Sequence, residues 1–208
     1  EPEMLLIFAS NPLVTIGDVD LIARALQKFR FFVDITIYLD ETAQFADVIV
    51  LARELTLSQI QRIICRIKKQ NITGPKGQPL KIEIFVHGAL CVAISGKCYM
   101  SLAVYNASAN RGACLQNCRR SYRVTDEETG DELVVDNKYI MSPKDLCTIG
   151  FLDKIIAAGV HVLKIEGRGR SPEYVSTVVS TYNAALKAIQ NSTYSKENIT
   201  IWTEELSK

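Results

Sequence analysis

The sequence has no long hydrophobic run and almost no net charge. No apolar segment reaches the roughly eighteen residues that a membrane-spanning helix requires. The first ten residues, EPEMLLIFAS, lack the basic stretch and the small-residue cleavage site of a secretory signal. We therefore expect a cytoplasmic protein with no membrane span. The net charge of +1 excludes a polycation that binds nucleic acid over its whole surface, but it leaves a local basic patch open.

Histidine is scarce, and the common signatures of hydrolases are absent. The chain has two histidines and contains neither H-E-x-x-H nor G-x-S-x-G. His87 ends a predicted strand four residues before Cys91, so a catalytic Cys/His pair is conceivable, but a histidine bonded to the loop backbone is the simpler interpretation. His161 begins a predicted buried strand and has no acidic neighbour in the sequence, which indicates a structural role. Proteolysis has little support from these residues.

The sequence does contain an alternation of strands and helices. Apolar, β-branched runs predict strands at residues 4–9, 35–39, 47–52, 82–86, 139–141 and 160–165. Helical patterns occupy residues 16–29, 57–69, 143–158 and 172–189. Thr56 and Ser171 are the expected N-caps of the second and fourth helices, and Gly159 is the expected C-cap of the third. Strands that alternate with helices predict a parallel sheet, open or closed into a barrel.

The number of strand and helix units is too small for a complete barrel. An eight-unit barrel takes about 250 residues, whereas this chain has 208. We predict an α/β fold in which residues 1–208 form a single TIM-barrel-like catalytic domain, incomplete and corresponding to the later part of a barrel. Only the seven residues DETAQFA separate the strands at 35–39 and 47–52, and a parallel crossover takes roughly a dozen. Either these strands are not parallel neighbours, or residues have been lost between them.

Cysteine carries most of the chemical information. Five of the six cysteines lie within 57 residues: Cys91, Cys98, Cys114, Cys118 and Cys147. Cys65 stands apart in a predicted amphipathic helix, where a core position is expected. In a reducing compartment clustered cysteines are ligands or catalysts rather than disulfides, although any single one could be a small buried hydrophobe. Only Cys114 and Cys118 have the close spacing usual for zinc. An iron–sulfur cluster accepts thiolates from separate loops, so spacing leaves both metals open.

The stretch EIFVHGALCVAISGKCYMS, residues 83–101, resembles the signature of the collagenase-like peptidase family, numbered thirty-two among peptidases of unknown type. The segments NASANRGACLQNCRRSY, YIMSPKDLC and VLKIEGRGRSPEYV are similar to the next blocks of that family, in the same order. The resemblance covers residues 45–189, and the first forty residues match poorly. Within the family, SGKCYMS and NRGACLQNCR are most similar to the branch that hydroxylates uridine in transfer RNA.

The resemblance implies a TIM-barrel-like enzyme that hydroxylates the wobble uridine of transfer RNA with prephenate as hydroxyl source. It also implies a four-iron four-sulfur cluster with Cys91, Cys98, Cys114 and Cys147 as ligands and Cys118 as a substitute. The family's peptidase label implies the alternative of a collagenase-like peptidase, with doubtful protease activity. A zinc-stabilised RNA-binding module is a further alternative. A partner subunit or a homo-oligomer is left open.

A basic segment follows the second group of cysteines. Four arginines occur between residues 111 and 123 without an acidic residue among them: Arg111, Arg119, Arg120 and Arg123. Tyr122 lies between two of them, and arginines interleaved with an aromatic ring are typical of surfaces that bind nucleic acid. We expect Arg119 and Arg120 to bind RNA, with an ordinary solvated surface as the alternative.

The end of the last predicted strand carries a second group of charges. The segment KIEGRGRS places Lys164, Glu166, Arg168 and Arg170 where barrel enzymes carry catalytic groups. Arg168 or Arg170 could bind prephenate or a phosphate, because a guanidinium binds carboxylates and phosphates in a bidentate manner. Glu83, His87 and Glu166 are the candidate catalytic residues. Glu54 and Glu83 are strand-end acids that a helix cap or an ion pair would explain equally well.

Overall fold

The computed structural model describes residues 4–8, 18–29, 31–36, 45–74, 76–91, 93, 98–107, 113–134, 144–167 and 170–207. The chain, expected to be a single domain, divides into two compact units. Unit 1 comprises residues 1–88 and 147–208, and unit 2 comprises residues 89–146.

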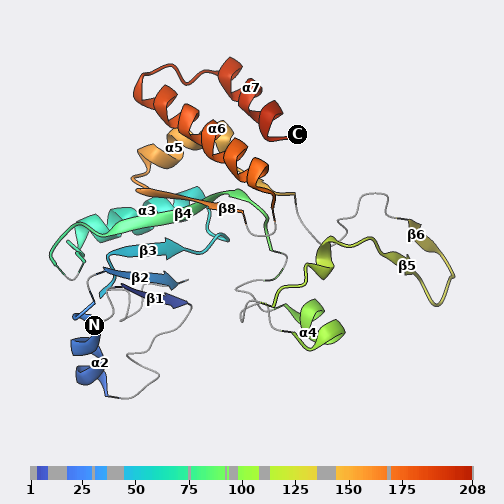
Figure 1. Cartoon of the computed structure of the whole chain (residues 1–208), viewed down its shortest axis with the longest axis horizontal. Coiled ribbons are helices and arrows are strands. Elements are labelled where there is room, and N and C mark those ends of the chain that lie inside the picture. Colours follow the sequence, from blue (N-terminus) through green and yellow to red (C-terminus); the bar gives the residue numbers. More distant parts are fainter. Residues whose placement is uncertain are drawn as a thin grey trace. The chain divides into compact units, whose positions relative to one another are not determined.

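Unit 1 is built on a parallel sheet. Its strands are β1 (Met4–Phe8), β2 (Phe31–Thr36), β3 (Val48–Leu51), β4 (Lys81–Gly88), the two-residue strand β7 (Leu146–Cys147) and β8 (Val162–Glu166). The first four lie side by side in chain order, and both β7 and β8 join β4. The pairings β1–β2, β2–β3, β3–β4 and β4–β8 are parallel (Figure 1). This topology confirms the α/β class with a parallel sheet.

The described part of the sheet is open. Among the described strands β1 stands at one edge and β8 at another, and no pairing joins these two. Closure into a TIM-like barrel therefore stays a prediction.

The second and third strands are parallel neighbours, with Val33 paired to Val48. The first alternative for the short connection, that these strands are not neighbours, is therefore wrong. The strand β2 runs from residue 31 to residue 36 instead of residues 35–39, which lengthens the connection to β3. Asp47 fixes this arrangement, because its N–H donates to the Phe32 carbonyl (2.8 Å) and its carboxylate accepts from the Phe32 N–H (2.9 Å). Residues 37–44 lie outside the described residues, as does the strand expected at 139–141.

The helices of unit 1 are α2 (Val19–Leu26), α3 (Leu57–Lys69), α5 (Leu152–Ala157), α6 (Pro172–Gln190) and α7 (Lys196–Leu206). Two of them begin as the sequence predicts. Thr56 and Gln59 form a capping box at the start of α3, and the Ser171 hydroxyl accepts from the Tyr174 N–H (3.2 Å) at the start of α6. Figure 1 shows α7 beside α6 at the C-terminal end. None of the described helices is long and apolar enough to cross a bilayer.

The helix expected at residues 143–158 is wrong in its first half. The strand β7 and the 3-10 helix η5 (Ile149–Phe151) occupy that part, and α5 begins only at Leu152. The cause is a tertiary contact: the Thr148 N–H donates to the Val86 carbonyl of β4 (3.1 Å), which ties this backbone to the sheet. The C-cap of α5 is Ala158, one residue before the predicted Gly159, and Gly159 follows it with a φ of 93°, the left-handed conformation that commonly ends a helix.

The two faces of the sheet differ in character. Ile49, Ile82 and Ile84 are buried and pack in one core with side chains of α3, α5 and α6. Because side chains alternate along a strand, Glu83 and Phe85 lie on the opposite face, and both are only half-buried. Glu83 and its ion-pair partner Lys164 therefore lie on the face away from this core.

Unit 2 has little regular structure. It contains α4 (Tyr99–Tyr105), the 3-10 helix η4 (Asn117–Arg119), and an antiparallel hairpin of β5 (Arg123–Thr125) and β6 (Glu132–Val134). The hairpin overlaps the acidic segment TDEETGDELVVDN. Within its described part, unit 2 has no buried hydrophobic side chain, and its buried residues are Ser101 and Asn117. A unit of this size without an apolar core usually needs a disulfide or a metal to hold it together.

Candidate functional site

Four of the five clustered cysteines lie in unit 2, and three of them act electrostatically on the fourth, Cys118. Partial burial raises the pKa of Cys118; Arg119 lowers it, and Cys91, Cys114 and Cys98 raise it further. Cys91, Cys98 and Cys114 therefore each lie within electrostatic reach of Cys118, since interactions between charges weaken with distance. All six cysteines of the chain are free, so disulfides do not stabilise this unit.

Cys98 lies at the start of α4, and its surroundings favour the thiolate. The hydroxyl and the backbone N–H of Ser101 each lie 3.4 Å from the Cys98 sulfur. Hydrogen bonding, first from the Ser101 side chain and then from its backbone, lowers the pKa of Cys98. The thiolate is the form of cysteine that binds metals.

The donor chemistry of these residues fits a thiolate-bound metal, but the arrangement is not a closed site. Among the described residues, no three His, Cys, Asp or Glu side chains come close enough to hold one metal ion. Three of the four ligands that the resemblance implies, Cys91, Cys98 and Cys114, share unit 2 with Cys118. The fourth, Cys147, belongs to unit 1, where its exposed thiol lies near Tyr182. Cys65 is exposed on α3, so the expected core position for it is wrong.

The structure separates the arginines of the basic segment. Arg119 pairs with Asp145 (3.2 Å) and its side chain is 13% exposed. Arg120 is exposed, donates to the Tyr105 hydroxyl (2.7 Å), and places its guanidinium 5.4 Å from the centre of that ring. Arg123 lies 3.8 Å from Glu132. Arg111 lies outside the described residues.

The helix α4 presents apolar and aromatic side chains that the sequence analysis did not single out. Tyr99 is 75% exposed, and Leu102, Val104 and Tyr105 are also exposed. The signal in the sequence is the segment YMSLAVY, which has an aromatic residue at each end and no charge. Exposed aromatic rings beside an arginine can stack on bases of single-stranded nucleic acid.

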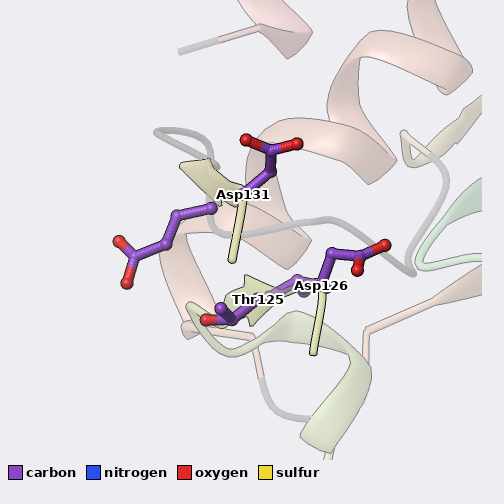
Figure 2. A pocket seen from close by; sticks show the side chains of 5 residues that line it. Thr125, Asp126 and Asp131 are labelled. Carbon is purple, nitrogen blue, oxygen red and sulfur yellow. The ribbon is translucent and has the colours of Figure 1, made fainter. Parts of the chain in front are cut away.

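The acidic hairpin carries a shallow pocket of about 470 Å³ lined by residues of both strands (Figure 2). The Asp126 carboxylate accepts from the N–H groups of Glu128 (2.8 Å) and Thr129 (2.9 Å), and these bonds lower its pKa. In Figure 2 the side chains of Asp126 and Asp131 reach out in separate directions. These carboxylates hold a turn, and they would repel the phosphates of RNA.

His87, a candidate catalytic residue, is buried against two tyrosines. The register of β4 against β8 shifts between Phe85 and His87. The His87 ring lies 6.0 Å from that of Tyr174 and 5.5 Å from that of Tyr182, both on α6, and its Nδ1 is 3.4 Å from the Tyr182 hydroxyl. Only 4% of His87 is exposed, so a substrate does not reach it.

The buried hydroxyl of Tyr182 ties three elements together. It donates to the Val86 carbonyl of β4 (2.8 Å) and accepts from the Thr148 N–H (3.1 Å) next to β7. Burial raises the pKa of Tyr182, and the nearby Cys147 thiol adds to this effect. The phenol therefore stays protonated and acts as a structural donor.

The charged residues of β4 and β8 form a separate group. Glu83 and Lys164 make an ion pair (3.0 Å). The Arg170 guanidinium lies 4.9 Å from the centre of the Tyr174 ring, Glu166 is half-buried at the end of β8, and Arg168 lies outside the described residues. His161 is exposed, and its Nδ1 accepts from the Ile82 N–H (3.4 Å).

Comparison with known proteins identifies the family. The model of peptidase family U32 matches residues 38–208. The chain belongs to this family. The resemblance drawn from the motifs is thereby confirmed, over a longer stretch than residues 45–189. No solved structure matches the chain.

Curated relatives in the U32 family carry two kinds of name. The chain is 57% identical over 165 residues to a "Collagenase" of Porphyromonas gingivalis, which covers 79% of this chain and 40% of that protein. It is 36% identical over 170 residues to "tRNA hydroxylation protein P1" of Bacillus subtilis, covering 78% and 37%. It is 42% identical over 141 residues to "23S rRNA 5-hydroxycytidine C2501 synthase" of Escherichia coli, covering 68% and 20%.

The sequence identities indicate which relatives within the U32 family the chain resembles more. The chain spans less than half the length of these relatives. The relatives carry the names of a protease or of RNA-modifying proteins, so the members of the family are enzymes. The chain is more similar to the collagenase than to the transfer-RNA hydroxylation proteins, and the expected position nearer to the transfer-RNA branch is not supported.

Proposed function

We propose that this U32 chain is part of an enzyme that hydroxylates a base in RNA with the help of an iron–sulfur cluster. The observation that carries the proposal is the make-up of unit 2. Its described residues include no buried hydrophobic side chain, yet three thiols, those of Cys91, Cys98 and Cys114, each lie within electrostatic reach of Cys118. A small unit without an apolar core or a disulfide gains stability from a bound metal, because metal binding is coupled to folding.

The donor set suits an iron–sulfur cluster, and the family resemblance favours that cluster over zinc. The candidate ligands are all thiols, which bind zinc as well as iron, and an iron–sulfur cluster accepts them from widely spaced positions. Cys91, Cys98 and Cys114 would hold the cluster, with Cys147 or Cys118 as the fourth ligand. The bound cluster would supply a redox-active centre, while residues of the chain bind the substrates.

The surface of unit 2 supports an RNA substrate. Arg120 offers a cation beside the Tyr105 ring, and Tyr99 offers a largely exposed ring on the same helix. Phosphates attract such cations, and bases stack on such rings. Following the resemblance, we propose the wobble uridine of transfer RNA as the target and prephenate as hydroxyl source. The cytoplasmic location, and a partner subunit or homo-oligomer, stay proposals.

A collagenase-like peptidase is the second candidate, and the 57% identity to the protein named collagenase favours it. The described part of unit 1 gives it less support, since His87 is withdrawn from solvent. A hydrolase needs an accessible nucleophile with its base, or a metal-bound water.

The test is to purify the full chain without oxygen and to measure iron, sulfide and zinc. The protein is then incubated with unmodified transfer RNA and prephenate, and the nucleosides are analysed by mass spectrometry for the gain of one oxygen atom. A parallel incubation with collagen tests proteolysis. We expect iron with sulfide and a hydroxylated uridine. Both should be lost in Cys91→Ser and Cys114→Ser and retained in the control Cys65→Ser. Zinc without iron, or collagen cleavage that persists through repurification without RNA modification, would overturn the proposal.

A further inference from the structure

Unit 1 has two cations close to one aromatic ring. The Arg53 guanidinium carbon lies 5.9 Å from the centre of the Phe85 ring, and the Lys164 ammonium lies 5.3 Å from it. Arg53 follows β3, Phe85 belongs to β4 and Lys164 to β8, so three separate strands bring the group together. The sequence signal for Arg53 is its position directly after the apolar run VIVLA.

The charges of this group do not cancel. Glu83 neutralises Lys164 through the ion pair at 3.0 Å. Within the part of the chain that the structure describes, no carboxylate lies within ion-pair distance of Arg53. Two cations and one anion leave a net positive charge beside an apolar ring. A lysine ammonium has three N–H donors, so Lys164 retains donors beyond the one that it gives to Glu83.

The position of the group suits a ligand. Phe85 and Lys164 are direct partners in the β4–β8 register, so they share one face with Glu83. The core with α3, α5 and α6 lies on the other face. Arg53, Phe85 and Lys164 are half-buried, which leaves part of each accessible. Arg53 stands at the carboxyl end of its strand, the end at which α/β proteins bind their ligands.

We propose that Arg53 and Lys164 bind the carboxylate groups of a small organic anion beside Phe85. A guanidinium accepts a carboxylate in a bidentate manner. The apolar ring favours a ligand with an organic frame over a fully hydrated inorganic ion, because contact with the ring displaces water. The inference rests on the proposed function, in which this anion is the small-molecule co-substrate. It moves that role away from Arg170, whose guanidinium lies over Tyr174.

Calorimetric titration of the full chain tests this site directly, without RNA or activity. The probes are prephenate, succinate and inorganic phosphate. We expect prephenate to bind more tightly than phosphate. Arg53→Gln should weaken prephenate binding about 10- to 100-fold, the usual effect of removing a hydrogen-bonded charge. Lys81→Met is the matched control, since this exposed lysine lies at the start of β4. The Lys81→Met variant should bind prephenate as tightly as the unaltered chain does.

The ion pair needs a second variant, because Lys164→Met alone leaves the Glu83 carboxylate without its cation. The double change Glu83→Gln with Lys164→Met removes both charges, and it should weaken prephenate binding by a similar factor with the fold preserved. The proposal is overturned if neither carboxylate probe binds the unaltered chain, if Arg53→Gln binds prephenate as the unaltered chain does, or if phosphate binds as tightly as prephenate. RNA hydroxylation and iron content are separate readouts. Their absence, with Arg53-dependent prephenate binding intact, would remove the proposed RNA function and leave the anion site standing.

Discussion

At the scale of single residues, neighbours in the sequence have different surroundings. Arg119 and Arg120 are adjacent, but the first is largely covered and paired with Asp145, 26 residues away, while the second is exposed on the ring of Tyr105. A sequence pattern treats the two as one basic patch. Their contacts indicate that Arg120 can meet a ligand and that Arg119 stabilises unit 2.

Arg120→Ala and Arg119→Ala should therefore have different effects. Loss of Arg120 should weaken RNA binding and lower the slope of log K against log salt by about one unit, because one phosphate contact is lost. Loss of Arg119 removes the ion pair with Asp145 and should reduce the stability of unit 2 by about 1–3 kcal/mol. Binding assays at several salt concentrations and hydrogen exchange measure the two effects. Arg66→Ala on α3 is the control, and an equal loss of RNA binding there would contradict this division of roles.

At the scale of elements, β4 and β8 approach each other closely where β4 ends. Gly88 pairs with Glu166 and has a φ of 111°. A Cβ at this position would clash with the Glu166 carbonyl oxygen. Only glycine meets both demands, because it tolerates a positive φ and has no side chain. The same residue ends the first segment of unit 1 before the chain enters unit 2.

Gly88→Ala should destabilise unit 1 strongly, and Gly77→Ala separates the causes. Gly77 also has a positive φ, 75°, but no described atom lies within 4 Å of its Cβ position. Gly77→Ala should lower the free energy of unfolding by about 1–2 kcal/mol through backbone strain alone. Gly88→Ala should lower it by about 1–3 kcal/mol more, because the added methyl group overpacks against β8. Urea unfolding followed by circular dichroism measures both values. Equal costs would mean that β4 and β8 separate readily.

At the scale of the whole molecule, the two units are stabilised in different ways. Unit 1 has an apolar core between its sheet and the helices α3, α5 and α6. The described part of unit 2 has no buried hydrophobic side chain, but it has three thiols within electrostatic reach of Cys118. If a metal replaces the core in unit 2, the two units should respond differently to its removal.

Removing the metal from anaerobically purified protein should increase amide hydrogen exchange throughout residues 98–134 and leave the strands of unit 1 protected. The reason is that a metal-stabilised unit opens when its ligands are released, whereas an apolar core does not depend on them. Exchange followed by mass spectrometry resolves the two regions. Cys65→Ser should keep both the metal and the exchange pattern. Unchanged protection of unit 2 after metal loss would show that its stability has another source.

The sequence alone determined what depends on local chemistry and on motifs. The alternation of apolar runs and helical periods predicted a parallel α/β sheet, and Thr56 and Ser171 marked two helix starts correctly, because capping involves residues three positions apart. The string around Cys91 and Cys98 was sufficient to identify the family.

Tertiary structure alone decided what depends on residues distant in the chain. The late start of α5 follows from the bond between Thr148 and Val86, 62 residues apart in the sequence, and no helical periodicity contains that bond. The half-buried pairing of Arg119 with Asp145 requires chain reversal in unit 2. The approach of Arg53 and Lys164 to Phe85 requires that β3, β4 and β8 be neighbours. Strand pairing determines the contacts of Arg53 and Lys164 with Phe85, because the register of a parallel sheet places side chains from separate segments on one face.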